Sequence, residues 1–326
     1  MTPQNNQRGA ALLTVLIFIA IIAVLAVTMT DTLTRALGRA SAGEARDQAF
    51  WALYGLEQAA IGYLEEQGEA IDQPGTPLFR EPVTLPFEGG VATISFFERT
   101  NCFNINDLVD QGGEGSGPVK DEAAVARFGS LIVALGGTRS AADQVGGRII
   151  DFIDDNQRAE PGGAEDYDYA RRAVPYRTPG APMASVSELR VIEGFSRDVY
   201  RSLAPFLCTL PTDGPQSLNV NTLTPAQAPL VVSIMGDALN LAQAVRLIDE
   251  APDEGFGTVQ EFLEQPLLQG LDLPSDTSTF FGTESRLLMM EMVLESPVGR
   301  LRQETLLERT SGGVVVRERW VGERLP

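Results

Sequence analysis

The sequence predicts an α+β fold, in which a long N-terminal helix packs on an antiparallel sheet and a large all-α domain is inserted into that sheet. The chain begins with an uncharged apolar stretch that continues into an amphipathic one. Strand patterns occur on both sides of residues 102–281, and those residues contain a helical repeat. Because an amphipathic helix and a half-polar sheet each bury one face, we expect the two to pack together.

Composition limits the functions open to the chain. Its 326 residues include 44 acidic and 25 basic ones, for a net charge of −19. This charge disfavours nucleic acid, because phosphates need a basic surface. Histidine, the commonest general base and transition-metal ligand, is absent. Aromatic residues make up 7%, which is low for a sugar-binding groove beside paired carboxylates. We therefore expect no enzymatic activity.

Residues 10–30 have the length and composition of a membrane span. They contain no charge and no proline, and about 20 helical residues cover roughly the 30 Å of a hydrocarbon core. The stretch is longer than the apolar region of an ordinary secretory signal. Arg8 precedes it and Asp31 follows it, which favours a cytoplasmic N-terminus. The bulk of the chain then lies outside the cytoplasm; a simple signal anchor is the alternative.

The predicted helix continues beyond the membrane span. Residues 44–67 contain no proline, and Pro74 and Gly75 then break the chain. Apolar residues recur at spacings of three and four, which indicates an amphipathic helix. These residues are Ala45, Ala49, Leu53, Leu56, Ala60 and Leu64.

Strand patterns stand on both sides of the helical region. Residues 91–98 form one candidate strand, and apolar residues alternate from Leu288 to Leu294. Residues 301–309 and 314–320 flank a Ser-Gly-Gly turn, which predicts a hairpin. One strand before the insertion and three after it are most simply explained as a single antiparallel sheet.

The intervening region contains a degenerate duplication. Residues 103–108 and 218–223 share an apolar-Asn-apolar-Asn-x-Leu pattern, and each is followed by two helical stretches and a closing segment with Ser or Thr three residues before Glu. That last spacing is a capping box, and the whole is an internal repeat of helical units. The predicted helices are residues 123–135 and 143–153 in the first copy and 225–235 and 238–248 in the second; the closing segments are 183–189 and 256–262.

The repeated units resemble the helix-hairpin-helix, or SAM-like, fold, most clearly in residues 219–227. That fold often binds DNA through a glycine-rich hairpin. Here residues 192–195 carry Glu193 at the hairpin, and residues 267–270 match poorly as well. With the net negative charge, a fold kept for protein contacts is the better interpretation. The paired asparagines are expected to cap or close turns.

An acidic loop, residues 151–182, occurs only in the first copy. Its first part contains seven carboxylates, and Pro161, Gly162 and Gly163 bend it sharply. Such a loop can supply the six to eight oxygens that Ca²⁺ prefers, whereas Mg²⁺ prefers a smaller set with retained waters. Arg158 interrupts an EF-hand-like start. The alternative is a solvated acidic loop.

The two cysteines mark equivalent places in the two copies. Cys102 immediately precedes the first asparagine motif, and Cys208 lies ten residues before the second. They are free buried thiols or a disulfide, which outside the cytoplasm would persist.

The chain as a whole resembles the K-type minor pseudopilins (GspK family) of bacterial type II secretion systems. The leader MTPQNNQRG, which meets the apolar run at Ala10, resembles that of type IV pilins and pseudopilins. The resemblance implies that a prepilin peptidase cuts between Gly9 and Ala10 and methylates the new N-terminus. Most pilins have glutamate at the fifth mature position, where this chain has Thr14. The K type also lacks this glutamate. The resemblance therefore implies that the subunit would be bound poorly by its neighbours in the middle of a filament.

The resemblance also implies a structural calcium site with two ions. Family members carry a similar acidic stretch, and Asp154, Asn156, Glu165 and Asp166 match its pattern, with Asn156 standing where aspartate is usual. Some members have cysteines at the places of Cys102 and Cys208, which implies a disulfide. The secondary candidates for calcium ligands are Asp151, Asp155, Glu160, Asp168 and Glu188.

The function that the resemblance implies is capping of the pseudopilus tip together with the I and J minor pseudopilins. It further implies a single-pass location in the inner membrane with a periplasmic head, help in starting assembly, and contact with the secretin and the exported cargo. The alternatives are a minor pilin of a type IV pilus and a membrane-tethered DNA receptor. The expected divisions are residues 1–9 (leader), 10–30 (span), 31–101 and 282–326 (pilin-like head), and 102–281 (insert, with repeats 102–208 and 209–281).

Overall fold

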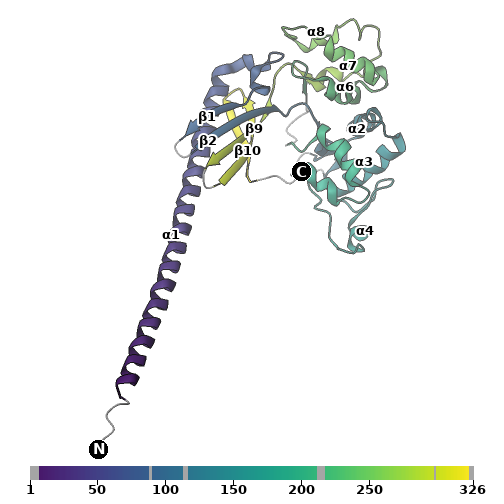
Figure 1. Ribbon diagram of the computed structural model, residues 1–326. Helices are drawn as coiled ribbons and strands as arrows, with labels where there is room; N and C mark the ends of the chain where they lie inside the picture. The colour runs from purple at the N-terminus through teal and green to yellow at the C-terminus, as the bar shows by residue number, and fades with distance from the viewer. Residues whose placement is uncertain (1–6, 88–89, 113–116, 211–216, 297–298, 323–326) are drawn as a thin grey trace, which may run out of the picture.

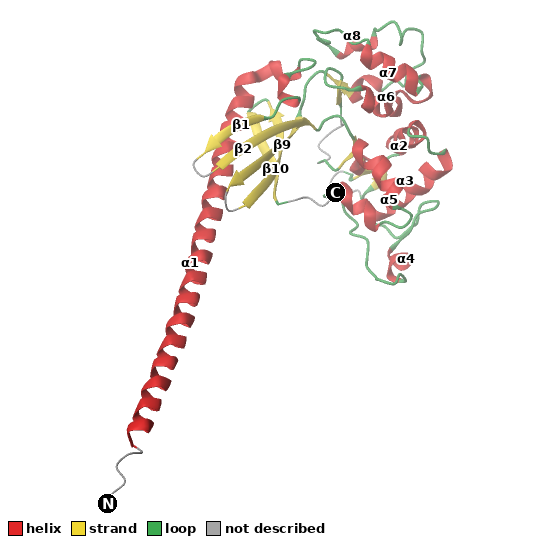
Figure 2. Cartoon of the chain, in the orientation of Figure 1, coloured by secondary structure: helices red, strands yellow, loops and turns green. Residues whose placement is uncertain are grey.

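The computed structural model describes residues 7–87, 90–112, 117–210, 217–296 and 299–322. A long rod ends in a head that consists of a sheet and a group of short helices (Figures 1 and 2). The helices are α1 (Gln7–Gln67), α2 (Glu122–Ala134), α3 (Arg139–Ile153), α4 (Asp166–Ala170), α5 (Arg197–Leu203), α6 (Ala228–Met235), α7 (Leu241–Asp249) and α8 (Val259–Leu263). The long strands are β1 (Val83–Phe87), β2 (Gly90–Glu98), β9 (Leu287–Ser296), β10 (Gly299–Thr310) and β11 (Gly313–Val321). Two-residue strands are β3 (Phe103–Asn104), β4 (Val109–Asp110), β5 (Val119–Lys120), β6 (Leu207–Cys208), β7 (Leu218–Asn219) and β8 (Phe281–Gly282).

The N-terminal helix is continuous from the apolar stretch into the head. It has 61 residues, or about 90 Å at the usual rise per residue. In the described part of the chain it is the one helix with the length and composition of a membrane span, and its most apolar window is not buried by the rest of the protein. Gly9 and Ala10 lie in its first turns. The predicted long apolar N-terminal helix is confirmed.

The long strands form one antiparallel sheet in the order β1-β2-β9-β10-β11. The strands predicted on both sides of the insertion are present, so the predicted antiparallel sheet is confirmed. The sequence analysis missed β1, which contains Pro86 and is largely exposed. A proline is tolerated there because β1 is an edge strand, where one side makes no ladder hydrogen bonds.

One face of the sheet packs on the upper half of α1. The predicted stripe supplies the helix side of this core, in which Ala49, Leu53, Ala60 and Leu64 are buried. Alternate residues of β2 and β9 supply the other side. The lower half of α1 extends away from the head (Figure 1).

A buried carboxylate lies within this apolar interface. Glu57 of α1 is fully buried and pairs with Arg319 of β11. It also accepts hydrogen bonds from the Gln303 amide (2.7 Å) and the Thr305 hydroxyl (3.0 Å) of β10. Three side chains on two strands are thereby tied to one position on the helix, which fixes the register between them.

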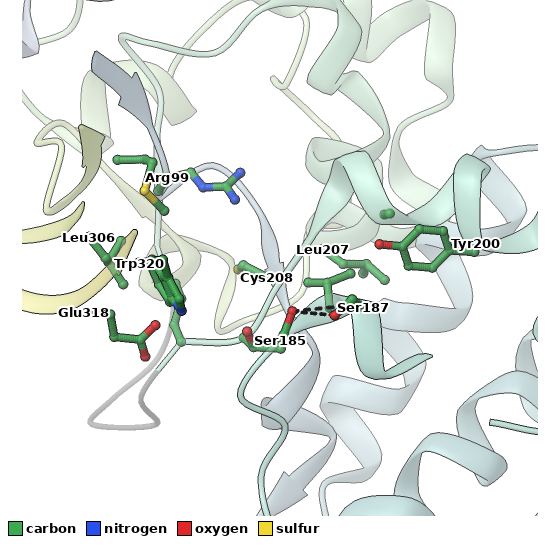
Figure 3. Close-up of a pocket in the computed structure, with 14 residues that line it drawn as sticks. Arg99, Ser185, Ser187, Tyr200, Leu207, Cys208, Leu306, Glu318 and Trp320 are labelled. Atoms are coloured by element: carbon green, nitrogen blue, oxygen red, sulfur yellow. Dashed lines mark hydrogen bonds between the residues drawn. The ribbon is translucent and has the colours of Figure 1, made fainter. Parts of the chain in front are cut away.

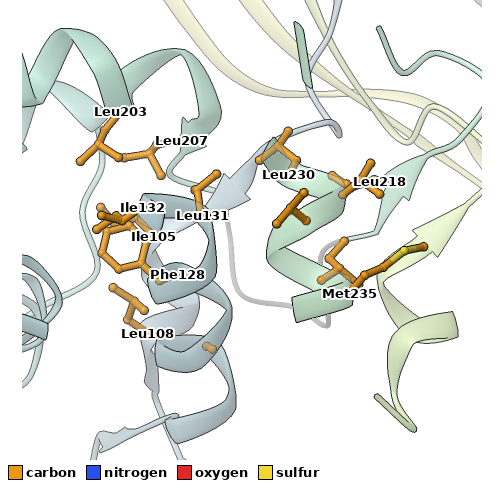
Figure 4. Packing of buried hydrophobic residues seen from close by; sticks show 14 of the residues in the cluster. Ile105, Leu108, Phe128, Leu131, Ile132, Leu203, Leu207, Leu218, Leu230 and Met235 are labelled. Atoms are coloured by element: carbon orange, nitrogen blue, oxygen red, sulfur yellow. The ribbon is translucent and has the colours of Figure 1, made fainter. Parts of the chain in front are cut away.

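The short helices lie between β2 and β9 in the chain and beside the sheet in space (Figure 2). Helix α2 packs on both α3 and α6, so one apolar cluster runs through both copies of the repeat. Figure 4 shows Leu131 of the first copy near Leu230 of the second. The likeness of these units to the helix-hairpin-helix fold stays a prediction.

The paired asparagines have matching roles in the two copies. The side chain of Asn106 exchanges two hydrogen bonds with the backbone of Met183, and Asn221 does the same with Phe256. Parallel two-residue pairs, β3 with β6 and β7 with β8, close the two units. The asparagines thus attach each motif to its own closing segment, across 77 and 35 residues, which extends the predicted turn-closing role.

Replacement of Glu57 by alanine should strongly destabilise the head, because it leaves Arg319, Gln303 and Thr305 without their common acceptor. We expect the free energy of unfolding to fall by about 3 kcal/mol, as for one partner removed from a buried pair. Glu66→Ala is the matched control, since Glu66 is an exposed carboxylate on the same helix. Denaturant unfolding of the full chain in detergent measures both; equal effects of the two substitutions would contradict the assigned anchor.

Candidate functional site

The acidic loop begins in the last turn of α3 and lies at the outer end of the first helical unit. Asp151 belongs to α3, Asp154 ends it, and Glu165 precedes α4. All three side chains are buried. In Figure 2 this loop, with α4 at its tip, projects away from the sheet.

The three buried carboxylates have oxygens without hydrogen-bond partners among the described residues. These are Asp151 Oδ2, Asp154 Oδ1 and both oxygens of Glu165. The other Asp151 oxygen accepts from the Glu160 backbone N–H at 3.0 Å. A buried ionised oxygen without a partner is costly, so each of these oxygens needs a proton, a water molecule or a cation that the described residues do not supply.

Burial and mutual repulsion raise the pKa values of these carboxyls. Burial, with the charge of neighbouring acids as a further cause, raises the pKa of Asp151 to about 6 and that of Asp154 to about 6. Burial, then the charges of Asp151 and Asp154, raises the pKa of Glu165 to about 7. The charges of Asp151 and Asp154 thus act on Glu165, and the charge of Asp154 acts on Asp151, which indicates an electrostatically coupled group.

The other predicted ligands have protein partners or face solvent. The Thr178 N–H and hydroxyl donate to Asp166 at 2.8 and 3.0 Å. Asp168 accepts from the Glu165 N–H (3.2 Å), and Glu188 closes the predicted capping box with Ser185. Asp155 and Asn156 are exposed, and the Asn156 amide donates to Asp154 Oδ2 at 2.7 Å.

Glu160 is paired with a cation from the protein itself. Lys120, the only lysine in the sequence, places its Nζ 2.9 Å from Glu160 Oε2 and 3.1 Å from Glu122 Oε1. Hydrogen bonding to Glu160 raises the pKa of Lys120. The sequence analysis missed this lysine because it lies 40 residues before its partner and outside the acidic stretch.

A cation fits the donor chemistry of the loop, although its ligands are not gathered at coordination distance. The described residues contain no ready group of three or more acidic or cysteine side chains that would hold a metal ion as they stand. Nevertheless, Asp151, Asp154 and Glu165 supply hard, anionic oxygens that lack other partners, which is the donor type that Ca²⁺ prefers.

The two cysteines form a disulfide that lies between the insert and the sheet. Cys102 and Cys208 are bonded, with Cα atoms 5.8 Å apart, and the parallel pairing of β3 with β6 brings them together. Their sulfurs belong to a small apolar cluster with Leu287, Met289 and Leu306, on the face of the sheet opposite α1. The predicted pairing is present in the structure.

A cleft of about 510 Å³ lies beside this disulfide. Trp320 and Glu318 of β11 form one wall, and Ser185, Ser187 and Tyr200 of the insert form the opposite one (Figure 3). Apart from Cys208, its lining includes none of the site residues predicted from the sequence. The cleft marks the boundary between sheet and insert.

Comparison with known proteins assigns the family. Models of type II secretion system protein K match residues 101–212 and 218–284. The type II secretion system protein K of Pectobacterium carotovorum subsp. carotovorum is 30% identical over 98% of each chain. The chain belongs to the type II secretion system protein K family. The type II secretion system protein K of Klebsiella pneumoniae is 31% identical to this chain over 82% of each chain.

A solved structure supports the fold of this protein K family member. The chain is similar to one in the crystal structure of the GspK-GspI-GspJ complex from enterotoxigenic Escherichia coli, with a TM-score of 0.73 and 24% identity over 88% of this chain and 100% of that one. The family resemblance found in the sequence is therefore confirmed. Protein K is a component of a secretion system, not a member of a known enzyme family, and the match favours secretion over the type IV pilus and DNA-receptor alternatives.

Proposed function

We propose that this chain is a minor pseudopilin that caps the tip of a periplasmic pseudopilus and helps to start its assembly for protein export. The observation that supports it most is the shape of the molecule: a long, largely bare helix carries a wide head (Figure 1). A bare apolar helix needs lipid or other helices around it, whereas an insert of this size leaves little room for a subunit stacked above.

The partners we propose are the I and J minor pseudopilins, by analogy with the complex of the structural relative. The outer side of α1 offers a contact surface for their helices. Phe50, Trp51 and Tyr54 form a row of edge-to-face aromatic contacts, and Trp51 is 67% exposed. Exposed apolar groups gathered in this way are typical of protein interfaces. Contacts with the secretin and the exported cargo remain part of the proposal.

The chain is proposed to lie in the inner membrane with its N-terminus in the cytoplasm and its head in the periplasm. Prepilin peptidase would then cut between Gly9 and Ala10. We expect the protein extracted from membranes to begin at Ala10, with one added methyl group, as measured by intact mass and N-terminal peptide mass. A mature chain that begins near residue 30 would contradict both the processing and the retained anchor.

The position at the tip is tested by immunogold labelling of sheared pseudopili. A chain with an epitope at its C-terminus should be labelled at one end of each filament, because Thr14 offers no carboxylate to a neighbour's terminal amine. The major pseudopilin with the same epitope is the control and should be labelled along the whole length. Labelling of this chain along the filament would refute the tip assignment, while leaving its family membership intact.

We also propose that the acidic loop binds calcium, with two ions as the family resemblance implies and a structural role. Bound Ca²⁺ would neutralise Asp151, Asp154 and Glu165 and supply the partners that their buried oxygens lack. Asn156 and Asp166 lie beside these residues and are proposed to complete the site through oxygens after a small adjustment of the loop.

Calcium should raise the thermal midpoint of the full chain by roughly 5 °C when it is in large excess over its dissociation constant. Because the ligands must be ionised, the affinity should fall as the pH drops below about 7, where the pKa of Glu165 lies. Calorimetric titration of Asp154→Asn and Glu165→Gln should show weakened binding. The matched control is Asp143→Asn, an exposed acid of α3 outside the loop, and equal loss in all three variants, or no binding by the native chain, would contradict the site.

A further inference from the structure

The segment of α1 just beyond the apolar stretch, residues 31–46, has a charge pattern that the proposed function does not use. We call it the neck. It contains Arg35, Arg39 and Arg46, and these outnumber its acids, Asp31 and Glu44. The whole chain has a net charge of −19, so the neck differs in sign from the acidic head above it.

The three arginines lie on one face of the neck. Their spacings of four and seven residues return to the same side of an α-helix, whereas Glu44, nine residues after Arg35, lies on the opposite side. Arg35 approaches Asp31 only to 3.9 Å, and both side chains are largely exposed. Arg39 and Arg46 are exposed and form no ion pair or hydrogen bond with any residue that the structure describes.

Distance from the membrane separates these arginines into two groups. At about 1.5 Å per residue, Arg35 stands about 8 Å, Arg39 about 14 Å and Arg46 about 24 Å beyond Thr30. The headgroup layer of one leaflet is roughly 5–8 Å thick. Side chains on a helix point back toward its N-terminus, which here is the direction of the membrane. Arg35 and Arg39 can therefore extend down to the headgroups, and Arg46 cannot.

We infer that Arg35 and Arg39 bind the phosphates of anionic phospholipid headgroups on the periplasmic side of the membrane. The inference rests on the proposed insertion of residues 10–30 with the head outside. Guanidinium groups form paired hydrogen bonds with phosphate oxygens, and long basic side chains at the end of a membrane helix extend into this layer. An acidic helix of a partner protein is a less favoured ligand, because nothing would restrict its contacts to the two arginines nearest the lipid.

Such contacts hold an acidic head close to an anionic surface that would otherwise repel it. They also belong to the membrane-resident state alone, since a subunit lifted into a filament loses the headgroups. The arginines therefore stabilise the chain in the membrane before assembly, without any contact to a protein partner.

Native mass spectrometry of the full chain in non-ionic detergent tests this inference. Phosphatidylglycerol, phosphatidylcholine and inorganic phosphate are titrated separately. We expect the native chain to retain phosphatidylglycerol in preference to the other two. The double variant Arg35→Gln/Arg39→Gln should bind it about thirtyfold more weakly, the size expected for two arginines beside an anionic surface, whereas the control Arg46→Gln should be unchanged.

Several outcomes would overturn the inference. One is equal retention of phosphatidylglycerol by the native chain and the double variant when circular dichroism shows both folded. A second is an equal loss in the Arg46 control, which would indicate unspecific attraction. A third is unchanged lipid binding with weaker co-purification of partner pseudopilins, which would assign the arginines to a protein interface. None of these results bears on the mature N-terminus or the tip position, so they are separable from the proposed function.

Discussion

The pairing of β2 with β9 is the constraint on which the rest of the head depends. The chain leaves the sheet at Glu98 and returns at Leu287, and the antiparallel ladder places Glu98 opposite Leu288. The insert therefore has to begin and end at neighbouring points, whatever it folds into between them. Because the cost of closing a loop grows slowly with its length, so long an insertion is tolerated once these two strands are paired.

Polar contacts at this point fix the direction of the insert. Glu98 accepts hydrogen bonds from Thr222 of the second copy and from Ser285, just before β9. Asn101 accepts from the Asn219 N–H at 2.7 Å and donates to Thr222 at 2.9 Å. Burial raises the pKa of Glu98, so its buried carboxyl needs these donors. The disulfide holds the first copy to the same region, and both copies are thereby attached close to one end of β2.

The contact between Asp72 and Arg309 extends this junction to the 3₁₀ turn (Gly68–Asp72) that directly follows α1. Arg309 of β10 donates to both Asp72 oxygens at 2.7 and 2.9 Å, and the Ser285 N–H donates to the same carboxylate. Glu57 forms the corresponding polar contact lower on the helix. Apolar packing between helix and sheet tolerates small slips, whereas these directional contacts exist in one register only. The orientation of the insert relative to the rod is therefore specified through hydrogen bonds as well as through the core.

Apolar stretches and alternation, together with the Ser-Gly-Gly turn, were sufficient to predict α1 and the four longest strands. It was insufficient for β1, whose exposed edge carries Pro86, and for Glu57, which looks like a surface residue from its neighbours in sequence. In the acidic loop, composition predicted a set of carboxylates, but only the fold distinguishes Asp151, with an oxygen lacking a partner, from Glu160, which Lys120 neutralises. Contacts between residues far apart in the sequence leave no local pattern.

Under the proposed function, the exposed lower helix has to be stable in two surroundings, first lipid and then the helices of neighbouring subunits. Its apolar side chains gain little from that exchange, because lipid tails and helix surfaces are similarly apolar. Charged groups are what differ between the two states. A carboxylate at the position of Thr14 would be costly in the membrane and relieved by a neighbour's amine in a filament. This chain has no such carboxylate to favour its transfer into a filament, and Arg35 and Arg39 gain contacts only near the headgroups. Both features favour a subunit that leaves the membrane only through its contacts with partner subunits. This is consistent with a position at the end of the assembly.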